Sequence, residues 1–234
     1  LNKIDRFVFA SSGAPAGNIT PPIHEEITPH PVSPYGASKL AADKLFISSN
    51  NFRGKKDIKF SVVRYGNVFE SRGSVIPFFM ELEKEGKKYF PITDINMTRF
   101  FISIEDGIKQ VIHSIFNSQG GEIFIPKMPS LKITDLAKAI NPNMKIKIIG
   151  TRPGEKLHET LISKDNPDKI VEFKKYYTIL PTINLFLKNQ NPYFKNHLNE
   201  KGKLLNHSVD YNSFNNPNYH KIKDVKKFLK KANG

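Results

Sequence analysis

The amino-acid sequence predicts an α/β protein with a largely parallel sheet. Short apolar runs rich in β-branched and aromatic residues alternate along the chain with segments whose apolar residues recur at helical spacing. Alternation of this kind is typical of proteins in which helices connect parallel strands. With 234 residues, of which 38% are hydrophobic, the chain is also long enough to bury a sizeable core.

The first elements are a strand, a long loop and a helix. Residues 6–12 form an apolar run that ends in Ser11 and Ser12, which predicts a buried strand that opens into a loop. Residues 13–34 are rich in proline and lack periodicity, so we expect them to be irregular and functional. From Tyr35 onward the apolar residues follow helical spacing and predict the first helix.

The rest of the chain continues the alternation. Residues 58–65 are rich in β-branched side chains and predict a second buried strand. In residues 105–117 the apolar side chains fall on one face, so an amphipathic helix is expected there. The other predicted elements are helices at 75–85, 133–140 and 221–231 and strands at 99–104 and 121–126.

Charge and composition narrow the function classes. Lys and Arg number 36 against 22 Asp and Glu, a net charge of +14, which raises the question of a nucleic-acid or anionic partner. The lysines are scattered and do not form one platform with aromatic residues, so we expect no nucleic-acid partner.

No apolar run approaches the roughly 20 residues of a spanning helix, so no membrane partner is expected. The absence of cysteine excludes disulfides and thiolate chemistry and fits a cytoplasmic location.

One helix face carries a pair of residues suited to hydride-transfer chemistry. Tyr35 and Lys39 stand one helical turn apart, so a phenol and an ammonium share a face. A nearby ammonium favours the phenolate and lowers the pKa of a tyrosine. Such a tyrosine can remove a hydroxyl proton while hydride leaves the same carbon, and Ser12 at the strand end can hydrogen-bond the substrate oxygen. A solvated pair on an exposed helix has the same spacing, so the surrounding motifs decide between the two interpretations.

Ordered motifs along nearly the whole chain resemble one superfamily. The chain resembles the extended short-chain dehydrogenase/reductases that act as nucleotide-sugar epimerases and dehydratases, in Phe9-Ala10-Ser11-Ser12, Ser33-Pro34-Tyr35-Gly36-Ala37-Ser38-Lys39 and Arg64-Tyr65-Gly66-Asn67-Val68. Its C-terminal two thirds is similar to the inverting UDP-N-acetylglucosamine 4,6-dehydratases and related polysaccharide biosynthesis proteins. That similarity is carried by residues 71–79, Ile92-Thr93-Asp94, Met97-Thr98-Arg99-Phe100, Gly121-Glu122-Ile123-Phe124, residues 152–159 and Tyr211-Asn212-Ser213.

The resemblance implies a fold and a division of the chain. The fold would be an incomplete Rossmann-type doubly wound parallel sheet, with its N-terminal half missing, joined to a smaller substrate-binding α/β portion. Residues 1–68 would be the C-terminal part of the NAD(P)-binding domain with the catalytic Tyr and Lys. Residues 69–164 would bind substrate and return a helix and a strand to the Rossmann core. Residues 165–234 would form an Asn- and Lys-rich C-terminal extension.

The resemblance also implies residue roles. Tyr35 would be the catalytic base, assisted by Lys39 and Ser12, and the cofactor NAD or NADP would be held by Ser11, Tyr35, Lys39 and Val68. The UDP-sugar substrate would be bound by Asn67, Val75, Ile76, Pro77, Phe78, Phe79, Tyr89, Arg99, Arg152 and Glu155. A guanidinium can bind a diphosphate bidentately, which agrees with the two arginines. No metal is expected, and full-length family members would form homo-oligomers.

Two departures from the family pattern leave alternatives open. The sequence has no Gly-x-Gly-x-x-Gly loop to bind a dinucleotide pyrophosphate, so we expect residues upstream of Leu1 in a longer protein to supply it. In the dehydratases an acidic residue, then Lys or Glu, follows the strand-end Ser/Thr, but Gly13 and Ala14 stand here and cannot move a proton. The resemblance implies 4,6-dehydration of UDP-N-acetylglucosamine for surface polysaccharide, and the two departures keep two alternatives open. The alternatives are a UDP-sugar 4-epimerase and a truncated, non-catalytic protein that binds sugar nucleotide.

Overall fold

The computed structural model describes residues 4–12, 34–69, 71–151, 155–164, 169–181 and 192–232. The chain divides into two compact units whose segments alternate along the sequence. Unit 1 comprises Leu1–Tyr65, Gly107–Lys127 and Leu161–Asp210, and unit 2 comprises Gly66–Asp106, Met128–Thr160 and Tyr211–Gly234. By function, the family resemblance divides the chain into three continuous segments, with boundaries after residues 68 and 164. That division stays a prediction.

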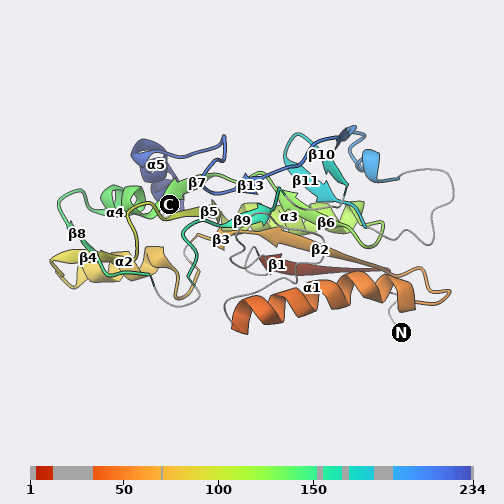
Figure 1. Ribbon diagram of the computed structural model, residues 1–234, viewed down its shortest axis with the longest axis horizontal. Helices are drawn as coiled ribbons and strands as arrows, with labels where there is room; N and C mark the ends of the chain where they lie inside the picture. Colours follow the sequence, from red (N-terminus) through yellow and green to blue (C-terminus); the bar gives the residue numbers. More distant parts are fainter. Residues whose placement is uncertain are drawn as a thin grey trace. The chain divides into compact units, whose positions relative to one another are not determined.

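Unit 1 is built on a mixed six-stranded sheet (Figure 1). In spatial order its strands are β1 (Arg6–Ser12), β2 (Lys59–Tyr65), β6 (Ile123–Pro126), β11 (Tyr176–Ile179), β10 (Ile170–Glu172) and β12 (Lys203–Leu205). Strands β1, β2 and β6 run parallel, and the other three join antiparallel. The register pairs Ser11 with Arg64 and Ser12 with Tyr65, so both serines lie at the carboxyl end of the parallel strands.

Helix α1 (Pro34–Phe52) lies against β1 and β2 (Figure 1), and aromatic side chains form part of the contact. The Phe46 ring stacks on Phe9 with 4.8 Å between ring centres and meets Phe60 edge-on at 6.2 Å. Near the end of the helix, Asn50 Nδ2 donates to the Phe60 carbonyl at 2.8 Å, and its Oδ1 accepts from the Phe60 N–H at 3.0 Å. These paired bonds fix the C-terminal end of α1 on β2.

A buried ion pair fixes the middle of α1 on the same strand. Arg64 of β2 approaches Asp43 of α1 with 3.1 Å between Nη2 and Oδ2, and the side chains are only 17% and 3% exposed. Arg64 Nη1 also donates to the Leu161 carbonyl oxygen at 3.2 Å. Because a buried charge is costly without its partner, this pair strongly favours one position of α1 along the sheet.

Helix α3 (Ile104–Asn117) exists where the sequence predicts it, but its apolar face is not the face that packs. Its buried residues are Gly107, Gln110 and Ser114, two of them small enough for close approach of the helix. Ile108, Ile112 and Phe116 are 52%, 48% and 60% exposed. Amphipathic spacing therefore located this helix without showing which side would be covered.

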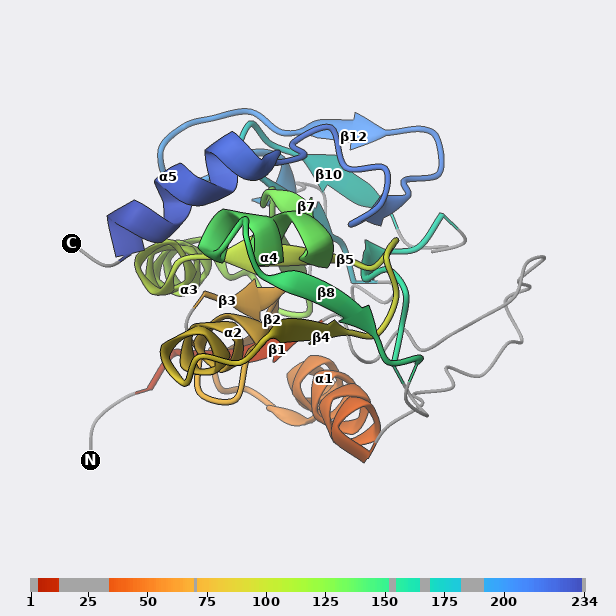
Figure 2. The same ribbon diagram turned by 90° about the vertical axis from the view of Figure 1, so that its left-hand side faces the viewer.

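Unit 2 surrounds a core of large apolar side chains. Its helices are α2 (Val75–Lys84), α4 (Ile133–Ile140) and α5 (Ile222–Ala232), and Figure 2 shows α5 beside α4. One sheet joins β3 (Asn67–Val68), β5 (Thr98–Ile102) and β7 (Ser130–Lys132), and β4 (Tyr89–Ile92) pairs in parallel with β8 (Lys145–Ile148). The core includes Phe79, Phe90, Leu136, Val225 and Leu229.

The structure contains every predicted helix and strand, with ends that differ by a few residues. It also contains short elements that the sequence did not indicate, among them β9 (Thr160–Ile162), β13 (Tyr211–Asn212), the 3-10 turn Pro192–Phe194 and the antiparallel strands of residues 165–234. Strands this short give no clear period of alternation, and pairing with neighbours rather than local pattern defines them.

Glu122, just before β6, is a fully buried carboxyl group in unit 1. Its Oε1 accepts from the Gln119 N–H at 2.6 Å, and the side chain has no exposed surface. Burial raises the pKa of Glu122 to about 7, although backbone N–H groups of the same turn act in the opposite direction. The folded protein therefore binds this proton more tightly than the unfolded chain does.

We expect Glu122→Gln to become progressively more stable than the wild type as pH rises. Stability that comes from the raised pKa is fully present below the unfolded value and is lost as pH rises through about 7. The difference in free energy of unfolding should grow by about 2 kcal/mol between roughly pH 5.5 and 8.5. Urea denaturation at both values measures it, and a difference independent of pH would refute the assignment.

Removal of one member of the buried ion pair should destabilise unit 1 strongly. We expect Asp43→Ala to lower the free energy of unfolding by about 3 kcal/mol because it leaves Arg64 buried and uncompensated. The double variant Asp43→Leu/Arg64→Met should recover most of the loss, since it buries no charge. Denaturant unfolding of Asp43→Leu, Arg64→Met and the double variant measures the coupling, and strictly additive effects would contradict it.

Candidate functional site

In unit 1 the structure places the Lys39 ammonium beside the Tyr35 phenol. Lys39 Nζ donates to the Ala10 carbonyl oxygen of β1 at 3.2 Å. The same nitrogen lies 4.8 Å from the centre of the Phe9 ring and 5.7 Å from the centre of the Tyr35 ring. Tyr35 is 56% exposed at the start of α1. A cation is thus held at the strand end next to an accessible phenol.

The two serines at the end of β1 have different surroundings. The Ser11 side chain is buried, and its Oγ has no hydrogen-bond partner among the described residues. Ser12 is half-buried and pairs in register with Tyr65. Burial raises the pKa of Tyr65, and the charge of an ionised Tyr35 raises it further. Tyr65 therefore remains a neutral phenol, so it is not itself the expected base.

Unit 2 contains a wide cleft of about 600 Å³. Its wall comes from β3, the start of α2, the end of β4 and the segment around residue 155. The lining residues are Asn67, Ser71, Gly73, Ser74, Val75, Pro77, Phe78, Phe79, Glu81, Pro91, Ile92, Thr93, Met97, Arg99, Ile133, Ile149 and Glu155. The volume lies in the range typical of small-molecule sites, and the lining mixes apolar surface with a few polar groups.

The N-terminus of α2 lies in the wall of this cleft. Ser74 is the N-cap residue and makes no side-chain capping bond, and the first turn carries no acidic residue. The helix itself offers no acceptor for the N–H groups of Val75 and Ile76, and Pro77 has no N–H. Free N–H groups and the helix dipole make such a terminus favourable for an anion.

Arg99 adds a positive charge to the same cleft. Its guanidinium donates to the carbonyl oxygens of Thr98 at 2.7 Å, Lys156 at 2.7 Å and Leu157 at 3.1 Å. Its Nε lies 3.9 Å from Oε1 of Glu159. Burial raises the pKa of Glu159, whereas the neighbouring Arg99 lowers it. The side chain is therefore held rigidly and keeps N–H donors for a ligand.

Thr93 fixes the carboxylate of Glu155, the second charged residue of the predicted substrate set that lines the cleft. Thr93, directly after β4, donates through Oγ1 to Glu155 Oε1 at 3.0 Å, and both residues line the cleft. A carboxylate has several acceptor positions, of which this bond uses one. Thr93 therefore fixes the Glu155 carboxylate in the wall of the cleft.

The predicted residues thus separate into two groups. Ser11, Ser12, Tyr35 and Lys39 are in unit 1, and the described residues of the predicted substrate set, with Val68, are in unit 2. Seven of that set line the cleft: Asn67, Val75, Pro77, Phe78, Phe79, Arg99 and Glu155. The Ile76 side chain is buried in the core and does not line the cleft. Tyr89 does not line the cleft either. Arg152, Gly13 and Ala14 lie outside the described residues.

Sequence reasoning assigned no role to several residues that line the cleft. One group belongs to motifs that carry the family resemblance, but nothing in the residue types indicates that they line a site. This group is Ser71, Gly73, Ser74, Thr93 and Met97. Pro91 and Ile149 come together only because β4 and β8 pair in parallel. For this second group the sequence alone contains no signal.

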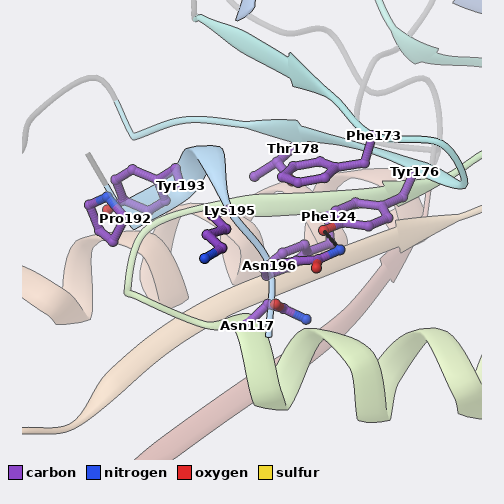
Figure 3. Close-up of a pocket in the computed structure, with 9 residues that line it drawn as sticks. All are labelled: Asn117, Phe124, Phe173, Tyr176, Thr178, Pro192, Tyr193, Lys195 and Asn196. Carbon is purple, nitrogen blue, oxygen red and sulfur yellow. Dashed lines mark hydrogen bonds between the residues drawn. The ribbon is translucent and has the colours of Figure 1, made fainter. Parts of the chain in front are cut away.

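Unit 1 contains a much smaller cavity, which is not a second candidate site for a ligand. Figure 3 shows Asn196 pointing toward the Tyr176 hydroxyl near the rings of Phe124 and Phe173. Asn196 Nδ2 and the Tyr176 hydroxyl are 3.4 Å apart, and Tyr193 also lines the cavity. Its volume of about 10 Å³ accommodates a water molecule at most.

Within the described ranges no helix is long and apolar enough to cross a membrane, and no group of three or more His, Asp or Glu is arranged to hold a metal.

Two comparisons relate the chain to known sequences. The family model described as "Polysaccharide biosynthesis protein" matches residues 27–181. A UDP-N-acetylglucosamine 4,6-dehydratase (inverting) from Campylobacter jejuni subsp. jejuni serotype O:2 is 51% identical over 205 residues, which are 88% of this chain and 61% of that protein. The chain therefore spans less than two thirds of the length of this curated relative.

Solved structures agree with the sequence comparisons. The protein Pen from Bacillus thuringiensis superposes with a TM-score of 0.76 at 28% identity, over 98% of this chain and 63% of that one. A UDP-glucuronic acid 4-epimerase from Bacillus cereus, solved with UDP-glucuronic acid and NAD, has a TM-score of 0.54 at 22% identity over 67% of this chain and 52% of that one. The second likeness concerns the fold alone. From the family match and the close relative together, the chain belongs to the polysaccharide biosynthesis protein family.

Proposed function

We propose that the chain is the catalytic and sugar-binding part of an NAD(P)-dependent enzyme that modifies a UDP-sugar. The cleft of unit 2 carries this proposal, because it combines the open N-terminus of α2 with the Arg99 guanidinium, and both favour a diphosphate. Glu155, fixed by Thr93, supplies acceptors for sugar or ribose hydroxyl groups. Dehydration of UDP-N-acetylglucosamine is the first candidate reaction, because the curated relative with 51% identity has that activity.

The residues of unit 1 fit the nicotinamide end of the cofactor. Lys39 projects an ammonium at the carboxyl end of β1, and the buried Ser11 Oγ has no partner among the described residues. When bound, NAD or NADP supplies the hydride acceptor. Lys39 would hold the nicotinamide ribose, with Ser11 and Val68 beside the cofactor. The sequence has no Gly-rich loop for the dinucleotide pyrophosphate, so binding by this chain alone should be weak.

Tyr35 would start the reaction as a general base. It removes the proton of the sugar 4-hydroxyl while the C4 hydride is transferred, which leaves a ketone at C4, and Ser12 donates a hydrogen bond to the same oxygen. Lys39 Nζ lies 5.7 Å from the centre of the Tyr35 ring, so a positive charge stands beside the phenol that takes the proton. For dehydration, a base must then remove the C5 proton and an acid must protonate the leaving 6-hydroxyl, which departs as water. The hydride taken from C4 would then return to C6 and a proton to C5, which gives the 4-keto-6-deoxy product.

The second candidate is a UDP-sugar 4-epimerase. It needs oxidation at C4, rotation of the keto sugar and reduction from the other face, and no group that moves the C5 proton. Gly13 and Ala14, which occupy the positions of the dehydratase acid and base, favour this candidate. A 4-keto-6-deoxy product from UDP-N-acetylglucosamine supports dehydration, whereas a C4 epimer alone supports epimerisation.

A third candidate is a non-catalytic protein that only binds sugar nucleotide. It predicts binding of UDP-N-acetylglucosamine without binding of NAD(P) or turnover. Homo-oligomer formation, implied by the family resemblance, and a cytoplasmic location, expected from the absence of cysteine, complete the proposal. Sedimentation analysis tests the first of them.

We expect the chain to bind UDP more tightly than uridine and to lose this preference on Arg99→Gln. Removal of a charge-assisted hydrogen bond should weaken UDP binding by about 10- to 100-fold. Titration calorimetry of the chain with UDP-N-acetylglucosamine, UDP and uridine measures the effect. Arg6→Gln, which removes the same charge in unit 1 outside the cleft, is the matched control. Equal affinity of the wild type for UDP and uridine would refute a diphosphate site.

Tyr35→Phe should lower turnover strongly without changing UDP affinity. Loss of a general base lowers turnover by about 100- to 10,000-fold, whereas the cleft residues are untouched. Turnover is measured on the longest natural form of the protein that carries these residues, with UDP-N-acetylglucosamine and NAD(P). Tyr219→Phe, which alters a tyrosine outside the proposed site, is the control. Full activity of Tyr35→Phe would exclude the proposed mechanism.

A further inference from the structure

Ser213 lies at the centre of a hydrogen-bond network behind the cleft of unit 2. Its side chain has no exposed surface, and it does not line the cleft. Its Oγ accepts from the Glu159 N–H at 2.9 Å, donates to the Thr98 carbonyl oxygen at 3.2 Å and lies 2.7 Å from Thr98 Oγ1. One hydroxyl group therefore joins the start of β5 to the segment that ends at Glu159.

The same network includes a histidine that allows two proton arrangements. Thr98 Oγ1 lies 2.8 Å from His158 Nδ1. Burial lowers the pKa of His158, and the Arg99 charge lowers it further, so the ring is neutral at neutral pH. If Nδ1 accepts, Thr98 donates to it and Ser213 donates to Thr98 Oγ1. If Nδ1 donates, Ser213 donates to the Thr98 carbonyl, and in both arrangements Ser213 accepts from Glu159.

These bonds define the surroundings of the Arg99 guanidinium. Arg99 is held by the carbonyl oxygens of residues 98, 156 and 157 and by the Glu159 carboxylate. Ser213 ties residue 98 to residue 159, so it spans the two segments that supply these acceptors. The Ser213 hydroxyl is therefore a common anchor for the groups that surround Arg99.

The two residues before Ser213 hold its backbone in place. The Tyr211 hydroxyl accepts from the Met128 N–H at 2.6 Å and donates to the Met128 carbonyl at 3.2 Å. Asn212 Oδ1 accepts from the N–H groups of Phe214 and Asn215 at 2.9 and 3.0 Å. The motif Tyr211-Asn212-Ser213, to which sequence analysis gave no role, is therefore a built anchor.

We propose that Ser213 is a positioning residue that holds Arg99 in the orientation that binds the ligand diphosphate. It acts through the Thr98 and Glu159 backbone and does not touch the ligand. This inference rests on the proposed function of the cleft. It predicts that loss of the hydroxyl affects recognition of the diphosphate and leaves recognition of the nucleoside unchanged, whereas a purely structural role would not distinguish the two ligands.

The test compares Ser213→Ala with Ser130→Ala in calorimetric titrations with UDP and uridine. Ser130 is equally buried in unit 2, and its Oγ has no partner among the described residues, so the control makes the same change without loss of a hydrogen bond. We expect Ser213→Ala to weaken UDP binding at least about 10-fold and uridine binding less than about 2-fold, because a misplaced guanidinium no longer donates to the diphosphate. Ser130→Ala should change neither affinity.

A double-variant cycle shows whether the effect passes through Arg99. In the Arg99→Gln background, Ser213→Ala should cause little further loss of UDP affinity. Additive losses, or equal losses for UDP and uridine, would overturn the inference. If Ser213→Ala fails to fold by circular dichroism, Ser213→Cys keeps the shape with a weakly hydrogen-bonding group and should show the same selective loss.

The outcomes separate this inference from the proposed function. If the wild-type chain binds UDP no better than uridine, the diphosphate site itself fails. If the wild type prefers UDP and Arg99→Gln removes that preference, but both Ser213 variants retain it, the site stands and the positioning role of Ser213 is wrong.

Discussion

The interaction on which the proposed site most depends is that of the Arg99 guanidinium with three backbone carbonyl oxygens and the half-buried Glu159 carboxylate. A guanidinium has a fixed fork of donors, so carbonyl groups that match it can hold two chain segments in one relation. The interaction therefore shapes unit 2 and keeps a positive charge at the cleft. Glu159 balances this charge, so the cation does not depend on a ligand for compensation.

Unit 1 uses a comparable device to place its reactive groups. Asp43 and Arg64 form a buried pair between α1 and β2, and Asn50 binds both backbone groups of Phe60. Tyr35 and Lys39 are on the same helix, so whatever fixes α1 on the sheet also fixes the phenol and the ammonium at the carboxyl end of β1. Packing of aromatic rings supplies burial, and the polar contacts supply the position.

Much of this arrangement could be predicted from the sequence because it depends on local pattern. The strand at residues 6–12, the helix after the proline-rich loop and the Tyr35–Lys39 spacing all follow from apolar periodicity or from one helical turn. Family resemblance drew attention to seven residues that line the cleft. The antiparallel strands β10, β11 and β12 could not be found in this way, since their pairing joins positions far apart in the chain.

The sequence by itself determined the α/β class, the order of the main elements and the pairing of Tyr35 with Lys39, because these depend on neighbours within a few residues. Only the tertiary structure decided which faces are buried and which polar groups meet. Helix α3 packs through Gly107 and Ser114 rather than through its isoleucines, because small residues allow close approach. Likewise Ser213 reaches Thr98 and Glu159 across long stretches of chain, and hydrogen bonds between distant segments leave no periodic trace in a sequence.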